Sequence, residues 1–392
     1  MENPWRRLLA LNPETEVWWD SSPLIWPNFK DDFPTSAPEK DREWLKKEFA
    51  DMYLEAPVNR WLFDGCTTNP PLSWNVLKTR KAEWAGIIKE IRKAYTGKSK
   101  YGLFLKVYSE VVKRGAEALL PLFEASGGKK GHISGQVDPQ LLRNSPAMIE
   151  MAEQLADLSP NVMIKIPGST QGIPVFRHLA SKGIATNATT VFTLPQIMMV
   201  AKMVHEGREI HLKDNPNPRF GWRAVCTEMS GRLEDSGSFR GVINAKNLDI
   251  SPLELRFASE YIVKKAAALI EERNHPIKIL KCSDRLHHNE KGEGFYPHID
   301  ALAGGPIIHT IPPKVVGEYM LLYKDKEITN GWNIPVQEKS LEKLRQVEFF
   351  RCASEETGYC VEEFNEIPSL LENEAEFVGA AREMIHYVGT FM

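Results

Sequence analysis

The chain has 392 residues, of which 42% are hydrophobic and 26% are charged, a composition typical of a globular protein with an ample core. Its formal net charge of −3 at pH 7 gives no basic footprint for nucleic acid or for an anionic membrane surface. No stretch approaches the roughly 18 apolar residues of a membrane-spanning helix, and residues 8–11, which follow two arginines, are too short for the core of a signal peptide.

Short apolar runs recur in the first three quarters of the chain and predict β-strands. They cover residues 16–20, 61–64, 131–137, 162–166, 183–187, 223–227, 277–282 and 306–309. Segments with helical patterns separate them, and this alternation predicts parallel β/α units. Eight such strands favour an α/β fold, a closed (β/α)8 TIM barrel over about residues 15–325. An open doubly wound sheet is disfavoured because no glycine-rich dinucleotide loop follows an early strand.

Capping patterns predict where three helices begin. Ser145-Pro146 suits an N-cap followed by the first helical residue. Residues 193–196 form a capping box before an apolar run, and Gly207 predicts the end of that helix. Residues 251–254 form a second capping box, which opens a helix that we expect to end near Arg273.

The remaining length lies in three segments. Residues 21–60 are rich in proline and charge, and we expect them to wrap the barrel. Residues 284–305 are expected to form a long loop that contains glycine and histidine. Residues 326–392 form a C-terminal helical extension, because apolar residues recur at helical spacing from Phe377 to Tyr387. The whole chain, residues 1–392, is thus predicted to be a single barrel domain.

Cysteine usage favours a reducing compartment. The five cysteines are scattered and odd in number, and none forms a CxxC pair. This pattern predicts a cytoplasmic protein with neither a disulfide framework nor a structural zinc site. We interpret Cys66, Cys226 and Cys282, which lie beside predicted strands, as small buried hydrophobic residues.

A lysine interrupts the apolar strand VMIKIP at residues 162–167. Because side chains alternate along a strand, Met163 and Lys165 would face the barrel interior while their neighbours face the helices. Desolvation lowers the pKa of a lysine, and a neutral amine can form a Schiff base with a ketone. A structural ion pair with a barrel carboxylate is the alternative. We favour the functional interpretation, because a fully buried, unpaired lysine is otherwise rare.

Polar residues end several of the predicted strands. They are Asp20, Asp64, Gln136, Asp138, Asn187, Thr189 and Thr227. Two arginines also follow late strands, Arg232 after the sixth and Arg285 after the seventh. The carboxyl ends of barrel strands are where active sites form, and phosphate sites are commonly built near the last strands. Arginine binds phosphate bidentately, although helix caps, turns and surface salt bridges are alternative roles for these residues.

Four stretches in order resemble motifs of the transaldolase family. They are DGCTTNP at 64–70, GHISGQVDP at 131–139, NVMIKIP at 161–167 and GIATNAT at 183–189. The similarity continues through Phe192 and Gln196 into Ser-Gly-Arg232, and it covers about residues 15–320. The resemblance implies a class I aldolase-type enzyme of carbohydrate metabolism, in the pentose phosphate pathway.

The resemblance also implies a role for each matching residue. Lys165 would form the Schiff base and Asp20 would handle protons and substrate hydroxyls. Thr189 would hold the catalytic water. The substrate would be positioned by Asn69, Asn187 and Thr227, and its phosphate would be bound by Arg232 and Arg285. No metal or organic cofactor is implied, because the protonated imine is itself the electron sink. The implied partners are sugar phosphates, with a homo-oligomer as the family tendency.

Three positions depart from the family pattern. Gln136 stands at a catalytic position where glutamate is usual, and its amide can hold the catalytic water but cannot exchange a proton at neutral pH. Thr227 replaces a serine and keeps the hydroxyl, whereas Met229 replaces an aromatic residue. The glutamine is similar to that of the smaller fructose-6-phosphate aldolases, but those carry a tyrosine at the position of Met229.

Several functions remain open at this point. The leading hypothesis is a transferase, a transaldolase that passes a dihydroxyacetone unit from a ketose phosphate to an acceptor aldose phosphate. The closest alternative is an aldolase that releases this unit to water. An unusual sugar phosphate or sulfonate is a further possible substrate. His287, His288, Glu290 and His298, with His309 close behind, could instead bind a metal for hydrolysis. A non-catalytic family member that binds sugar phosphates is the remaining alternative.

Overall fold

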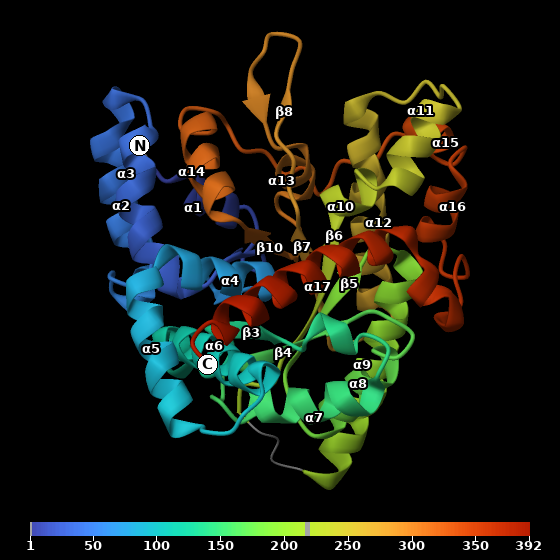
Figure 1. Cartoon of the computed structure of the whole chain (residues 1–392). Coiled ribbons are helices and arrows are strands. Elements are labelled where there is room, and N and C mark those ends of the chain that lie inside the picture. Colours follow the sequence, from blue (N-terminus) through green and yellow to red (C-terminus); the bar gives the residue numbers. More distant parts are fainter. Residues whose placement is uncertain (1, 216–219) are drawn as a thin grey trace.

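The computed structural model describes residues 2–215 and 220–392, and its centre is a closed barrel of eight parallel strands (Figure 1). The strands are β1 (Glu16–Trp19), β2 (Gly65–Cys66), β3 (His132–Gln136), β4 (Val162–Pro167), β5 (Thr186–Val191), β6 (Ala224–Met229), β7 (Lys278–Cys282) and β10 (Ile308–Ile311). They follow one another around the barrel in chain order, and β10 closes it against β1. The predicted (β/α)8 barrel is confirmed.

Two strands were placed wrongly by the sequence pattern. The second strand is β2, not residues 61–64, and it begins where Gly65 lets the chain pass the indole of Trp18. A Cβ on that glycine would lie 2.6 Å from the ring. Asp64 therefore stands at the amino end of β2, paired with Lys130 at 2.8 Å, and not at the carboxyl end. The fifth strand starts at Thr186 rather than residue 183, because Gly183 has a left-handed φ of +70° that suits a turn.

Helices follow the strands and surround the barrel. They are α4 (Pro70–Thr79), α5 (Lys81–Ala94), α6 (Lys100–Ala125), α7 (Ser145–Ala156), α8 (Ile173–Ser181), α9 (Leu194–Asp214), α10 (Ser230–Glu234), α11 (Val242–Ala245), α12 (Pro252–Glu272), α13 (Pro297–Leu302) and α14 (Pro313–Leu322). The loops contain short helical segments. They are the 3-10 helices η1 (Pro23–Ile25), η2 (Val58–Arg60), η3 (Pro139–Leu141) and η5 (Val361–Glu366), and the π-helical segment η4 (Gly237–Gly241).

Three helix starts were predicted. Thr193 caps α9 as expected, because its Oγ1 accepts a hydrogen bond from the backbone amide of Gln196 at 3.3 Å, although Gln196 Oε1 accepts from the backbone amide of Phe192 and not from that of Thr193. The capping box at Ser251 is confirmed, and α12 ends at Glu272, close to the expected position. Asn144, not Ser145, caps α7, since its Oδ1 accepts a hydrogen bond from the third residue of the helix. Gly207 does not end α9, which continues seven residues further to Asp214. A Cβ at Gly207 would lie 2.3 Å from the carbonyl oxygen of Arg177 in α8, so this glycine allows two helices to pack closely.

Residues 21–60 cover one side of the barrel, as the sequence predicted. They contain α2 (Trp26–Ser36) and α3 (Glu39–Met52), whereas α1 (Pro4–Leu9) precedes the first strand. Trp19 of β1 points outward into an aromatic cluster with Trp26, Tyr53 and Phe63, with ring centroids 4.9–6.3 Å apart. Burial of such rings is worth several kcal/mol each. The outward direction of Trp19 leaves the next residue, Asp20, on the interior side.

The C-terminal extension is helical, as predicted, and comprises α15 (Glu338–Leu344), α16 (Glu348–Ser354) and α17 (Pro368–Gly389). Helix α17 packs on α4 and α6 and also contacts β5 and α10, and Figure 1 shows it crossing the barrel in front of the strands. The expected loop at 284–305 holds a projecting hairpin, β8 (His287–His288) with β9 (Gly294–Phe295), followed by α13. That the whole chain is one domain stays a prediction.

Among the helices of residues 2–215 and 220–392, none combines the length and the apolar surface required to cross a bilayer.

Candidate active site

Lys165 lies in the barrel interior between two other predicted site residues. The strand register pairs it with Gln136 of β3 on one side and Asn187 of β5 on the other. The lysine is only 4% exposed, and its Nζ donates a hydrogen bond to the carbonyl oxygen of Thr68 at 3.3 Å. Three neighbouring strands thus bring an amine and two amides into one row.

The charge of Lys165 is balanced by one nearby carboxylate. Burial lowers the pKa of Lys165, and the negative charge of Asp20 partly opposes that effect. Burial also raises the pKa of Asp20, which Lys165 and a hydrogen bond from Thr67 oppose. Thr67 Oγ1 donates to Asp20 at 2.6 Å and lies 2.5 Å from the hydroxyl of Thr310. An amine with a lowered pKa that is electrostatically coupled to a carboxylate is suited to carbonyl chemistry.

The thiols nearest to this pair are not nucleophiles. Burial raises the pKa of Cys66 well above its ordinary value and that of Cys282 to about 11. Both groups therefore stay protonated at neutral pH.

Asn187 is held rigidly by two hydroxyl groups. Its Nδ2 donates to Ser134 Oγ at 3.0 Å, and Thr227 Oγ1 donates to its Oδ1 at 2.6 Å. All three side chains are buried. Because both ends of the amide are engaged, its donor and acceptor edges have a fixed orientation.

Thr189 and Gln136 carry buried polar atoms that are free to take a ligand. Neither Thr189 Oγ1 nor Gln136 Oε1 has a hydrogen-bond partner among the residues that the structure describes. Strand β5 has a register irregularity between Ala188 and Val191, where Thr190 adopts a left-handed φ of +50°. Such bulges re-aim side chains and cluster at functional sites.

Asn69 and Asp138 are engaged in capping. Asn69 Oδ1 accepts a hydrogen bond from the backbone amide of Leu72 at 2.8 Å and so caps α4. The oxygens of Asp138 accept from the backbone amide of Gln140 at 2.9 Å and from the hydroxyl of Tyr101 at 2.7 Å. Asp138 is therefore fixed at the start of η3.

A close backbone approach brings α10, which carries Arg232, against the segment that carries Arg285. A Cβ at Gly231 would lie 2.2 Å from the Ser283 carbonyl oxygen and 2.7 Å from the Arg285 guanidinium carbon, so only glycine lets α10 meet the segment after β7. Each arginine already pairs with a carboxylate. Arg232 forms a bidentate pair with Glu376 of α17, at 2.5 and 2.9 Å, and Arg285 Nε donates to Asp235 at 2.7 Å.

Comparison with known proteins decides the family. The family model for transaldolase/fructose-6-phosphate aldolase matches residues 49–357. The chain belongs to this family. The Helicobacter pylori (strain Shi470) protein named Transaldolase is 26% identical over 287 residues, which are 72% of this chain and 79% of that protein. The Mycobacterium ulcerans (strain Agy99) protein named Transaldolase is also 26% identical, over 64% of this chain and 70% of that protein.

The Streptomyces avermitilis protein named Transaldolase 2 is more similar over a shorter part. It is 39% identical over 100 residues, so this chain spans about a quarter of that relative's length (27%). The predicted membership of the transaldolase family is confirmed by the family model.

Several residues of the site were not predicted. Ser134 could have been found, because it stands two positions before Gln136 and so faces the same side of β3. Thr67 and Thr68 lie in the motif at 64–70 but carried no predicted role. For Asp235 and Glu376 the sequence held no signal, since their contacts to the two arginines depend on packing between distant segments.

The histidines that could have formed a metal site are not brought together. His287 and His288 lie in the projecting hairpin, whereas His298 is buried against Glu234 and His309 lies on β10. No cluster of metal-binding side chains occurs within the described residues. A cavity of about 570 Å³ opens near Glu16, at the amino ends of the strands, and so lies away from Lys165.

Proposed function

We propose that the protein transfers a dihydroxyacetone unit from a ketose phosphate to an aldose phosphate through a Schiff base on Lys165. The observation that carries this proposal is the buried Lys165, whose lowered pKa is influenced by the charge of Asp20, in the interior of a transaldolase-family barrel. A lowered pKa raises the fraction of neutral amine, which can act as a nucleophile without a cofactor.

The reaction follows from the groups that face the lysine. The amine of Lys165 adds to the ketone, and loss of water gives an iminium ion. The C3–C4 bond then breaks as the C4 hydroxyl loses its proton, and the bonding electrons move to the iminium to form an enamine. The aldose phosphate leaves. The enamine attacks an acceptor aldehyde, whose oxygen takes up a proton, and water hydrolyses the new iminium.

Asp20 is the residue that we assign to these proton transfers. Gln136 cannot exchange a proton, and both oxygens of Asp138 are engaged by Gln140 and Tyr101. Burial raises the pKa of Asp20 toward the range useful for acid–base catalysis. Thr189 and Gln136, whose free oxygens are buried, would hold the water through which the proton moves.

The remaining residues would position the substrate. Asn187 and Thr227 form one hydrogen-bonded unit, whereas Asn69, whose Oδ1 caps α4, has an Nδ2 without a partner in the part of the chain that the structure describes, and this donor could bind a substrate hydroxyl. Arg232 and Arg285 would bind the phosphate group, the role for which an arginine fork is suited.

Chemical trapping tests the lysine. Incubation with fructose 6-phosphate and borohydride should leave a dihydroxyacetone-sized adduct on Lys165, located by peptide mass spectrometry. Lys165→Ala should lose turnover while retaining its circular dichroism spectrum. Lys281 is an internal control, because burial also lowers its pKa, to about 7, although it lies on a different strand. An adduct on Lys281, or turnover by Lys165→Ala, would contradict the proposal.

Cleavage without an acceptor is a second candidate, because Gln136 resembles the glutamine of fructose-6-phosphate aldolases. Turnover of fructose 6-phosphate with and without an acceptor aldose phosphate separates the two. Single-turnover C–C cleavage should be slowed strongly by Asp20→Asn and little by Asp138→Asn, and Gln136→Glu should raise transfer relative to cleavage. Cleavage by Asp20→Asn at the wild-type rate would show that another group carries the proton.

A further inference from the structure

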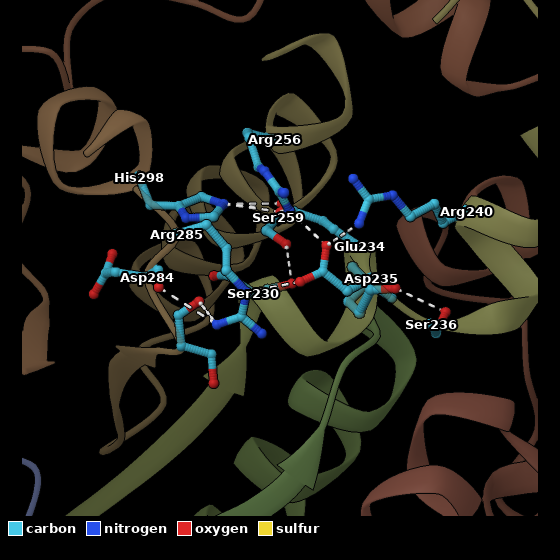
Figure 2. Close-up of polar contacts among 12 residues, drawn as sticks. Ser230, Glu234, Asp235, Ser236, Arg240, Arg256, Ser259, Asp284, Arg285 and His298 are labelled. Carbon is cyan, nitrogen blue, oxygen red and sulfur yellow. Dashed lines mark hydrogen bonds and ion pairs between the residues drawn. The ribbon is translucent and has the colours of Figure 1, made fainter. Parts of the chain in front are cut away.

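A line of charged side chains leads from Arg285 through Asp235 and Arg256 to Glu234 and His298 (Figure 2). Asp235, which follows α10, accepts a hydrogen bond from Arg285 Nε at 2.7 Å and another from Arg256 Nη1 of α12 at 3.2 Å. Arg256 Nη1 also donates to Glu234 at 2.7 Å, and His298 Nε2 of α13 donates to the same carboxylate at 3.0 Å.

The inner half of this line is buried. Glu234 and His298 are almost fully excluded from solvent, and Arg256 is nearly so. Burial alone would raise the pKa of Glu234, but His298 and Arg256 together hold it below its ordinary value. An ion pair in such a place is weak support for stability, because apolar residues of similar volume often serve better. Its presence therefore calls for another role.

At the outer end of the line, the guanidinium plane of Arg285 is held in one orientation. Arg285 Nε is bound by Asp235, and its Nη1 donates to the carbonyl oxygen of Ser283 at 3.0 Å. Ser283 has a left-handed φ of +67°, and Gly231 lies against the guanidinium carbon. Nη2 makes no hydrogen bond to any residue within the described ranges, so one donor edge of a fixed arginine is left for a ligand.

We propose that Asp235, Arg256, Glu234 and His298 are positioning residues that hold Arg285 in the orientation needed to bind the phosphate of the substrate. The proposal rests on the proposed function, since it takes Arg285 as a phosphate ligand. Asp235 contacts the arginine directly. Glu234 and His298 act one step further away, because they fix Arg256, which in turn fixes Asp235.

Two properties of the line make it suited to this role. Arg256 shares a single Nη1 between Glu234 and Asp235, so a shift of either carboxylate is transmitted to the other. The groups also come from the segments after two strands and from two helices, α12 and α13. The packed wall of the barrel therefore holds their side chains in fixed positions. A guanidinium held in this way loses less side-chain entropy when a phosphate binds.

The test compares KM for fructose 6-phosphate with KM for unphosphorylated dihydroxyacetone. Arg285→Ala should raise the first roughly tenfold to a hundredfold, the loss of one charged hydrogen bond. Asp235→Asn and Glu234→Gln should raise it several-fold, with kcat and the KM for dihydroxyacetone unchanged. Arg256→Lys, which keeps the charge, should recover part of the effect of Arg256→Gln.

Arg240 provides the matched control. It also faces the Asp235 carboxylate, at 3.5 Å, but it is 50% exposed and lies outside the buried line. Arg240→Gln should leave both KM values unchanged. A double variant gives a measurement that a merely structural role would not affect. Adding Asp235→Asn to Arg285→Ala should cause no further rise in KM, because Asp235 acts through Arg285.

The outcomes separate this proposal from the proposed function. If Arg285→Ala raises only the KM of the phosphorylated substrate but Asp235→Asn, Glu234→Gln and Arg256→Gln do not, the positioning role is overturned and the function stands. If the protein turns over no sugar phosphate, the affinity for inorganic phosphate is measured by calorimetry instead of KM. The positioning role then requires Asp235→Asn to weaken phosphate binding in the same direction as Arg285→Ala, and unchanged binding would overturn it.

Discussion

Neutralising Glu376 should strengthen the binding of phosphorylated substrates. Its carboxylate occupies the guanidinium of Arg232 in a bidentate pair, at 2.5 and 2.9 Å, with the ring of Phe377 5.8 Å from the guanidinium carbon. A substrate phosphate that uses Arg232 must first displace this carboxylate. Glu376→Gln keeps the shape of the side chain and removes the competing charge.

The magnitude follows from the exposure of the pair. The side chain of Arg232 is 31% exposed and that of Glu376 is 50% exposed, so solvent screens the interaction. Pairs of this kind contribute about 0.2–1 kcal/mol, and a bidentate geometry belongs at the upper end. Removing the competition should therefore lower KM for fructose 6-phosphate by up to about fivefold. KM for dihydroxyacetone should not change.

Steady-state kinetics with both substrates, at low and at high salt, checks this prediction. Glu374→Gln is the control, because Glu374 lies on the same helix and pairs with Arg143 at 2.5 Å rather than with Arg232. High salt should shrink the difference between Glu376→Gln and the wild-type protein. An unchanged KM for fructose 6-phosphate, or an equal change in Glu374→Gln, would refute the competition between carboxylate and phosphate.

Three further predictions concern the amine, the acid stability and one helix contact. Because the charge of Asp20 raises the lowered pKa of Lys165, Asp20→Asn should move the acid limb of borohydride trapping with dihydroxyacetone to lower pH; an upward shift would contradict this. Burial raises the pKa of Glu16, but its two cationic partners bring it to about 2 from an ordinary 4.5, so about 3 kcal/mol of stability present above pH 4.5 should be lost as the pH falls toward 2. Urea unfolding should show that Glu16→Gln lacks this loss. Gly207→Ala should destabilise the protein by about 1–3 kcal/mol through a clash with α8, whereas Gly379→Ala, with nothing within 4 Å, should stabilise it by up to about 1 kcal/mol.

Local patterns predicted the barrel well and its boundaries less well. Seven of the eight apolar runs overlap a strand of the barrel, because a buried strand must be apolar wherever it occurs. The second strand was misplaced, since the apolar run before Gly65 packs on the wrapping helices while the strand itself holds two residues. The end assigned at Gly207 failed because a glycine that stops a helix and one that admits a neighbouring helix are the same letter in the sequence.

The candidate site also contains contacts that local patterns predict and contacts that they do not. Lys165, Gln136 and Asn187 could be placed in one row because alternation along a strand and adjacency of consecutive strands are local rules. The hydroxyl of Thr310 lies 243 residues from Thr67 in sequence, and nothing in either segment indicates that they meet. Closure of the barrel between its last and first strands creates that contact.

The sequence by itself determined the family, the order of the strands and the lysine that faces inward, because each of these follows from residue type and local spacing. Only the tertiary structure decided what surrounds the two arginines. Glu376 lies 144 residues from Arg232, and His298 lies 64 residues from Glu234. Charges interact through space rather than along the chain, so their pairing is settled only when helices α10, α12, α13 and α17 pack around the barrel.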